Sequence, residues 1–138
     1  MSVVLNPYLA FDGNTREVME FYHQILGGTL AVQTFAEFGA PTSPAYQDNV
    51  MHARLDAVDG MVIMASDGPE GEPPVVGNNV TLSLGGGPAE GERLTTVFNA
   101  LADGGTTTMP LADVPWGATF GMLTDRHGIQ WMVNINKE

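Results

Sequence analysis

Hydrophobic and polar residues alternate near the end of the chain, between Trp116 and Asn134, with the two-residue period of β-strands. The stretch reads as two short strands joined by an Asp-Arg-His-Gly turn. One face of the second strand is apolar and fits a protein core: Ile129, Trp131, Val133 and Ile135. The opposite face is polar but almost uncharged: Gln130, Met132, Asn134 and Asn136. Such a face suits the wall of a cup that holds a small molecule better than a surface turned to bulk water.

The first half of the chain predicts one helix and four strands. The helix is expected at 15–26, where Asn14 and Glu17 form a capping box and Gly27-Gly28 ends the helix. Strands are expected at 5–11, 29–38, 50–58 and 61–67. The residues of the third strand that are expected to face the core are Met51, Ala53, Leu55 and Ala57. Residues 39–49 contain two prolines and no periodic pattern, which predicts a loop.

The same order of elements follows a linker at 68–78. The second half predicts a strand at 79–84, a helix at 88–102, strands at 106–111, 119–124 and 129–136, and a loop at 112–118. Four residues recur at a constant offset of 77, so that Phe21, Gly27, Gly28 and Thr29 match Phe98, Gly104, Gly105 and Thr106. The chain is therefore predicted to be one α+β domain of two βαβββ modules, residues 1–67 and 79–138, whose mixed sheets curve around a shared cup.

The composition excludes several classes of function. The chain carries 16 acidic and 5 basic side chains, and its net charge of −11 repels the phosphate backbone of nucleic acids. It contains no cysteine, which excludes disulfides and thiolate chemistry. No apolar run reaches the ~18 residues of a membrane span, and no signal peptide opens the sequence, so a cytoplasmic protein is expected. The acidity serves either solubility or the attraction of a cationic ligand.

Several stretches resemble one protein superfamily: the opening NPYLAFDGN, the strand MHARL, the strand end MASD and the closing WGATFGMLTDRHGIQWMVN. Together with the βαβββ repeat they are similar to the PhnB-like branch of the vicinal oxygen chelate (VOC) superfamily, which includes glyoxalase I, extradiol dioxygenases, fosfomycin-resistance enzymes and bleomycin-binding proteins. The resemblance spans nearly the whole chain and implies the glyoxalase-like fold, which hosts many activities. Members of the branch are often described as ubiquinone-pathway methyltransferases, but the sequence shows no methyl-donor site of the strand–glycine-loop–helix kind.

The resemblance also implies where a metal would bind, since enzymes of the superfamily take their ligands from the first and last strand of each module. The corresponding positions of this sequence are Asn6, Met64, Asn79 and Met132. Two amides and two thioethers are poor ligands for divalent metals that prefer histidine and carboxylate groups. We therefore expect no metal and no other cofactor, with a loosely held divalent metal as the alternative.

The candidate ligand-binding side chains are those expected to face the cup: Asn6, Tyr8, His52, Arg54, Met64, Asn79, Trp116, Met122, Met132 and Asn134. Among them His52 and Tyr8 are the candidate catalytic residues, because an imidazole can act as a general base near neutral pH. The structural alternatives are that His52 only hydrogen-bonds within the sheet, that Tyr8 and the methionines only pack, and that Trp116 anchors a dimer contact. Asp67 is expected to be a turn residue.

These features predict a protein that binds a small molecule, such as an aromatic or cationic metabolite or drug, without the metal site of the superfamily. The first alternative is a lyase or isomerase of glyoxalase type, metal-assisted or based on His52 and Tyr8, so the sequence leaves open whether the chain is an enzyme. A further alternative is a structural dimer with an empty cup. A homodimer is expected, because a single pair of modules leaves sheet edges open and members of the superfamily usually dimerise.

Overall fold

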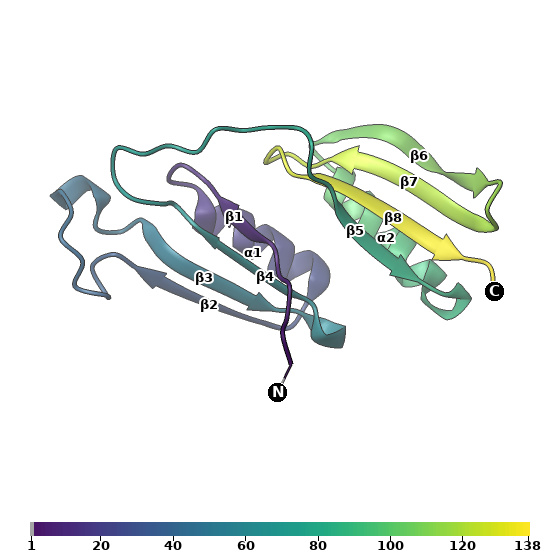
Figure 1. The fold of residues 1–138 in the computed structure, drawn as a ribbon, viewed down its shortest axis with the longest axis horizontal. Coiled ribbons are helices and arrows are strands. Elements are labelled where there is room, and N and C mark those ends of the chain that lie inside the picture. The colour runs from purple at the N-terminus through teal and green to yellow at the C-terminus, as the bar shows by residue number, and fades with distance from the viewer. Residues whose placement is uncertain (1) are drawn as a thin grey trace. The chain divides into compact units, whose positions relative to one another are not determined.

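The computed structural model describes residues 2–138, and the chain divides into two compact units between Val75 and Val76. This boundary lies within the segment expected to be a linker. Each unit contains a four-stranded mixed sheet and one α-helix (Figure 1) and is called a module below. No helix within residues 2–138 is both long and apolar enough to cross a membrane. The shared cup between the modules stays a prediction.

Module one has the order β-α-β-β-β. Its elements are β1 (Tyr8–Ala10), α1 (Thr15–Leu26), β2 (Thr29–Thr34), β3 (Val50–Asp56) and β4 (Val62–Ser66). The sheet has the strand order β1-β4-β3-β2, in which β1 and β4 are parallel and the other neighbours are antiparallel. Short 3-10 helices at Pro44–Tyr46 and Val58–Gly60 lie in the connections on either side of β3.

Module two repeats this topology. Its elements are β5 (Leu82–Gly86), α2 (Gly91–Ala102), β6 (Thr106–Val114), β7 (Ala118–Thr124) and β8 (Gln130–Asn136). The strand order is β5-β8-β7-β6, and again only the first and last strands of the module, β5 and β8, are parallel. The predicted α+β fold of two βαβββ modules is therefore confirmed.

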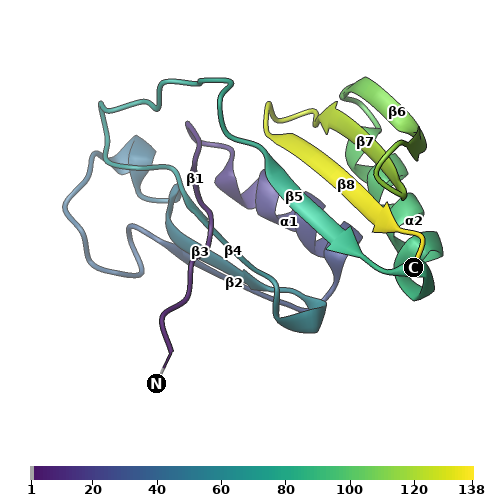
Figure 2. The same cartoon turned by 45° about the vertical axis from the view of Figure 1, so that its right-hand side comes forward.

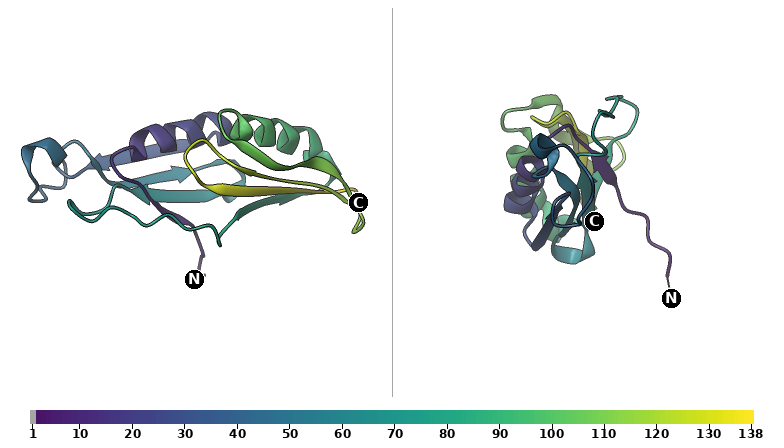
Figure 3. Two further views of the ribbon diagram at one scale, coloured as in Figure 1. Left: turned by 90° about the horizontal axis from the view of Figure 1, so that it is seen from above. Right: turned by 90° about the vertical axis from the view of Figure 1, so that its left-hand side faces the viewer.

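In each module the helix covers one face of the sheet and leaves the other face open (Figures 2 and 3). The side chains between helix and sheet are apolar and buried, among them Val18, Tyr22, Leu55 and Ala65 in module one and Phe98, Leu101, Trp131 and Val133 in module two. Burial of each large apolar side chain contributes about 1.5–3 kcal/mol to stability. Trp131 is only 2% exposed, so the predicted core face of β8 is confirmed.

The glycine pairs that recur between the modules end both helices and bring the next strand close to the sheet. Gly27 and Gly104 have φ angles of 73° and 80°, in the left-handed region that glycine adopts without strain. A Cβ atom at Gly28 would lie 2.0 Å from a backbone oxygen at the end of β3, and one at Gly105 would lie 2.3 Å from a backbone oxygen at the end of β7. The sequence repeat thus marks positions where the backbone leaves no room for a side chain.

The first strand of module one is shorter than the sequence predicts. It begins at Tyr8 and not at Leu5, because Pro7 has no N–H group to donate to β4. Only the Pro7 carbonyl oxygen takes part in the pairing, by accepting a hydrogen bond from the Met64 amide at 3.1 Å. Asn6 therefore precedes the strand in which the sequence placed it.

The first strand of module two also begins later than expected, at Leu82 instead of Asn79. Its parallel partner β8 begins only at Gln130, so the preceding residues have no neighbouring strand to pair with. The side-chain amide of Gln130 donates to the carbonyl oxygen of Val80 at 2.9 Å in place of a backbone ladder. Asn79 is exposed in a bend, and its predicted position within a strand is wrong.

The strand predicted at 29–38 ends at Thr34, where a local turn competes with the sheet. The carboxylate of Glu37 accepts hydrogen bonds from the amide and hydroxyl of Thr34 at 3.2 and 3.1 Å, and the Glu37 amide donates to the Thr34 hydroxyl at 3.1 Å. The pairing of β2 with β3 shifts register beside this turn. As a result Val50 is 1% exposed and Met51 is 37% exposed, so the predicted orientation of these two residues is wrong.

The strand predicted at 106–111 extends to Val114, and residues 112–114 were wrongly expected to be a loop. Pro110 lies inside the strand, which is compatible with a sheet because β6 is an edge strand and its pairing with β7 shifts register around the proline. The connection between β6 and β7 is therefore confined to residues 115–117.

The predicted capping box of α1 is wrong, because Asn14 makes no side-chain cap hydrogen bond. Asp67, which is only 2% exposed, takes that role from the end of β4. Its Oδ1 atom accepts hydrogen bonds from the amides of Gly13 and Thr15 at 2.9 and 3.0 Å and from the Thr15 hydroxyl at 2.6 Å. Its Oδ2 atom accepts from the Val50 amide at 2.7 Å. Asp67 is thus a buried junction of α1, β3 and β4 and not a simple turn residue.

Candidate functional site

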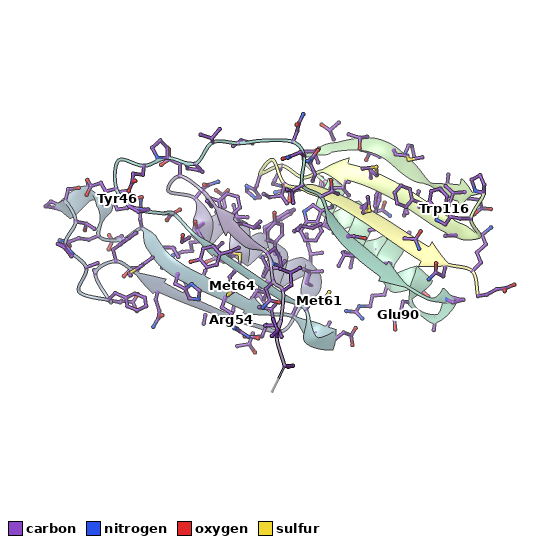
Figure 4. All side chains as sticks on the ribbon, viewed as in Figure 1. Tyr46, Arg54, Met61, Met64, Glu90 and Trp116 are labelled. Atoms are coloured by element: carbon purple, nitrogen blue, oxygen red, sulfur yellow. The ribbon has the colours of Figure 1, made fainter. Side chains whose placement is uncertain are left out.

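The open face of module one brings together four of the candidate residues. One row across the sheet consists of Tyr8, Met64, Arg54 and Ala31, which are partners on neighbouring strands. Figure 4 shows the side chains of Arg54 and Met64 on the adjacent strands β3 and β4. His52 lies two residues from Arg54 on the same strand, as the alternation of β3 predicts.

Tyr8 and His52 are in direct contact. The Tyr8 hydroxyl and the His52 Nδ1 atom are hydrogen-bonded at 3.1 Å, and the two rings are stacked with centroids 5.7 Å apart and planes inclined by 30°. Tyr8 is 52% exposed, and His52 is partly exposed. The fold thus joins the two candidate catalytic residues across 44 positions of sequence, while their catalytic role stays a prediction.

The charge of Arg54 is balanced by Asp56, which is not among the candidate residues. The guanidinium Nε atom donates to Asp56 Oδ2 at 2.9 Å, and Nη2 donates to Oδ1 at 3.0 Å. These hydrogen bonds lower the pKa of Asp56 and raise the pKa of Arg54. The spacing of two residues on one strand, which places both side chains on one face, is the signal that could have revealed the pair.

The open face of module two carries a mixture of apolar side chains and uncharged polar side chains. One row across the sheet consists of Ser83, Met132, Met122 and Met109, and the next consists of Gly85, Asn134, Phe120 and Ala112. The candidate residues Met122, Met132 and Asn134 therefore share one face, as the alternation predicted. The strand pairing adds Phe120 and Met109, which sequence reasoning missed although Phe120 alternates with the core residues of β7.

Trp116 lies in the turn between β6 and β7 and is held by two contacts (Figure 4). Its indole Nε1 donates to Asn134 Oδ1 at 3.1 Å. Its ring meets that of Phe120 edge-on, with centroids 5.4 Å apart and planes inclined by 71°. The side chain is nevertheless 62% exposed. Trp116 therefore presents an oriented aromatic surface beside the open face of module two.

The residues that the resemblance assigns to a metal do not fit one. Asn6 and Asn79 precede the strands that would position them, and Met64 and Met132 offer thioethers. Neither amides nor thioethers match the preference of divalent metals for imidazole and carboxylate ligands. Within residues 2–138 there is no group of three or more histidine, aspartate or glutamate side chains that could hold a metal ion. The expected loss of the metal stays a prediction.

A separate cavity of about 360 Å³ lies at the start of α1. Its lining includes Arg16, Glu17, Glu20, Asp48 and the buried Asp67, and none of the candidate ligand-binding residues. Both carboxylate oxygens of Asp67 are occupied by hydrogen bonds within the module. This cavity therefore does not extend the candidate site.

The structure is similar to several solved structures over its whole length. Protein PA1353 from Pseudomonas aeruginosa is 41% identical in sequence, with a TM-score of 0.87 and coverage of 99% of this chain and 100% of that one. The PhnB protein from Bacillus cereus is 23% identical, with a TM-score of 0.69 and coverage of 96% and 99%. A glyoxylase/bleomycin resistance protein/dioxygenase domain from Frankia sp. EAN1pec is 17% identical, with a TM-score of 0.64 and coverage of 100% and 94%. The last two similarities concern the fold alone.

The sequence also matches a protein-family model over most of its length. The model described as 3-demethylubiquinone-9 3-methyltransferase matches residues 4–134, which include every candidate residue of both open faces. The expected resemblance to the PhnB-like branch is confirmed by this match together with the structural neighbours. The chain therefore belongs to the 3-demethylubiquinone-9 3-methyltransferase family.

Proposed function

We propose that this protein binds a small molecule through the open sheet faces of its modules and does not use the metal site of the superfamily. The observation that carries the proposal is the oriented and exposed ring of Trp116, held by Asn134 and Phe120 beside a nearly uncharged face. A hydrogen-bonded tryptophan loses little conformational entropy when a ligand stacks on it, which favours binding. The methionines of the neighbouring row adapt to ligands of different shape.

The proposed ligand is aromatic, and the net charge of −11 favours a neutral or cationic compound over an anion. The proposal does not include the methyltransferase activity that the family description names. The glycine run at the end of β5 has a packing role: a Cβ atom at Gly86 would lie 3.0 and 3.1 Å from side-chain atoms of Glu90 and Leu94.

The test is a binding screen on the full chain with neutral aromatic compounds and aromatic amines, followed by tryptophan fluorescence and thermal melting. We expect at least one compound to change the Trp116 emission and raise the melting temperature. The variant Trp116→Ala should then bind that compound about 2–10-fold more weakly. Phe38→Ala, which removes an exposed ring from the loop after β2, is the matched control and should bind normally. A screen in which no compound changes either signal would contradict the proposal.

A second candidate function is a lyase or isomerase reaction, with His52 moving a proton and Tyr8 assisting. The contact between the two side chains favours it. The metal-assisted form of this reaction is separated from metal-free binding by dialysis against a chelator, metal analysis, and melting curves with added Zn²⁺, Mn²⁺, Ni²⁺ and Fe²⁺. Stoichiometric metal with strong stabilisation would favour the metal-assisted enzyme, and the absence of both would favour metal-free binding.

We also propose that the protein is a homodimer. Each module has unpaired edges, at β1 and β2 in module one and at β5 and β6 in module two, and such edges are commonly covered by association. Light scattering coupled to size exclusion should give twice the chain mass of 14.7 kDa. A mass of a single chain at micromolar concentration would refute this. The predicted cytoplasmic location stays a prediction.

A further inference from the structure

The Tyr8–His52 hydrogen bond favours one of the two positions that the proton of a neutral imidazole can take. A phenol hydroxyl is a stronger donor than acceptor, and the unprotonated nitrogen of a neutral imidazole is a good acceptor. The favoured arrangement is therefore Tyr8 O–H donating to His52 Nδ1 at 3.1 Å. The proton of the neutral ring then lies on Nε2, because one nitrogen is protonated when the other accepts.

The Nε2 atom is the part of His52 that is left for a ligand. Within residues 2–138, His52 has no hydrogen bond besides the one to Tyr8, and the ring lies on the open face of module one. An Nε2–H group donates and does not accept, so the neutral ring in this state binds an oxygen of the ligand and cannot remove a proton through Nε2. This consequence favours a binding role for His52 over the role of general base.

The charges around His52 determine whether a charged or an uncharged oxygen of the ligand is the better partner for Nε2–H. Arg54 is the cation on the same face, and two of its nitrogens are held by the carboxylate of Asp56. With this pair neutral and a net charge of −11 on the chain, a carboxylate ligand would be repelled more than an uncharged one. A neutral carbonyl oxygen accepts from Nε2–H without that cost.

We propose that Tyr8 is a positioning residue that holds His52 in the Nε2–H tautomer, so that His52 donates a hydrogen bond to a neutral carbonyl oxygen of the ligand. The ligand part of this inference rests on the proposed small-molecule binding, whereas the tautomer is a property of the ligand-free protein. The tautomer and the ligand contact can therefore each be disproved without the other.

The first experiment measures the tautomer by imidazole ¹⁵N NMR on the ligand-free full chain above the pKa of histidine. The His52 signals are assigned as those missing from His52→Gln, since the chain has two other histidines. We expect Nε2 to be the protonated nitrogen in the native protein. In Tyr8→Phe, which keeps the ring but removes the hydroxyl, the ratio of Nε2–H to Nδ1–H should fall about 2–10-fold. A native Nδ1–H tautomer, or an unchanged ratio in Tyr8→Phe, would overturn the positioning role.

The second experiment compares acetophenone with ethylbenzene, which lacks the carbonyl oxygen, at millimolar concentration. We expect acetophenone to shift the His52 Nε2–H signal and ethylbenzene to leave it in place. In the variants the preference is measured as the difference between the two compounds in the rise of melting temperature. His52→Gln, which keeps an N–H donor, should retain the preference for acetophenone, and His52→Leu should lose it. Equal effects of the two compounds, or no effect of either, would overturn the carbonyl assignment. If the proposed small-molecule binding itself is wrong, no compound in the binding screen will change the tryptophan fluorescence or the melting temperature.

Discussion

At the scale of single residues, module one depends on a buried carboxylate whose role cannot be read from its neighbours in sequence. Asp67 joins segments that are 17 to 54 positions away, through hydrogen bonds to three backbone amides and one hydroxyl. Asp125 has a similar role in module two, where it accepts from the amides of His127 and Ile129 and from the indole of Trp131. Both residues follow a strand directly, so the local pattern suggests only a turn.

Substitution of Asp67 by asparagine should destabilise the protein by about 2–3 kcal/mol, because hydrogen bonds to a charged acceptor are lost and an amide cannot accept at both ends. Urea unfolding of the full chain measures the change. Asp48→Asn is the matched control, since Asp48 lines the same cavity but is exposed. Equal unfolding free energies for the two variants would show that the Asp67 junction contributes nothing.

At the scale of elements, the long connection between β2 and β3 is tied down by a few polar contacts. Ser43 donates to Glu70 from its amide at 2.9 Å and from its hydroxyl at 2.5 Å. The Tyr46 hydroxyl donates to the carbonyl oxygen of Gly68 at 2.8 Å. The sequence predicted a loop here but not these contacts, because the partners lie more than 20 positions apart.

The hydrogen bonds from Ser43 lower the pKa of Glu70, first through the hydroxyl and then through the amide. A carboxylate with a lowered pKa in the folded state stabilises it above the pKa of the unfolded chain, about 4.3, and this contribution is lost as the pH falls through the lower folded value. An NMR titration of the Glu70 carboxyl carbon should show a midpoint below the ordinary glutamate range. In Ser43→Ala the midpoint should move upward, and an unchanged midpoint would contradict the contact.

The helices and strands also show which element bounds can be predicted from the sequence and which cannot. The helix α1 was predicted at about residues 15–26 and spans Thr15–Leu26, because its apolar spacing and its terminal glycines are local signals. The ends of β1, β2, β5 and β6 were missed, since each depends on where a partner strand starts or on a turn outside the strand. In the candidate site, alternation along the strands was enough to predict on which side of the sheet Tyr8, His52 and Met132 lie. The Tyr8–His52 contact could not be predicted without the strand order β1-β4-β3.

At the scale of the whole molecule, both modules have a glycine after the helix where two backbone segments approach each other too closely for a side chain. Gly28→Ala and Gly105→Ala should each cost about 2 kcal/mol or more, because the added Cβ would meet backbone that cannot rotate away. Gly87→Ala is the control: apart from its two chain neighbours, no atom lies within 4 Å of its added Cβ, and its φ of −86° suits alanine. Differential scanning calorimetry measures the three variants, and a loss in Gly87→Ala as large as in the others would refute the steric explanation.

The excess of acidic groups is also a property of the whole molecule. With a net charge of −11, the folded chain is destabilised by repulsion that salt screens, since the Debye length falls from about 30 Å at 0.01 M to about 8 Å at 0.15 M. The melting temperature should therefore rise with sodium chloride over this range. Exposed ion pairs such as Arg54–Asp56 and Lys137–Asp113 oppose the effect only weakly. A melting temperature that falls with salt would mean that attraction between charges outweighs repulsion.

The boundary between Val75 and Val76 also divides the chromophores of the protein. All three tyrosines, Tyr8, Tyr22 and Tyr46, precede it, and both tryptophans, Trp116 and Trp131, follow it. Selective excitation of tryptophan fluorescence therefore reports on the second half alone, while the NMR signals of the tyrosine rings report on the first half alone. The native chain can thus reveal, without any added label, whether its two halves melt together or one after the other.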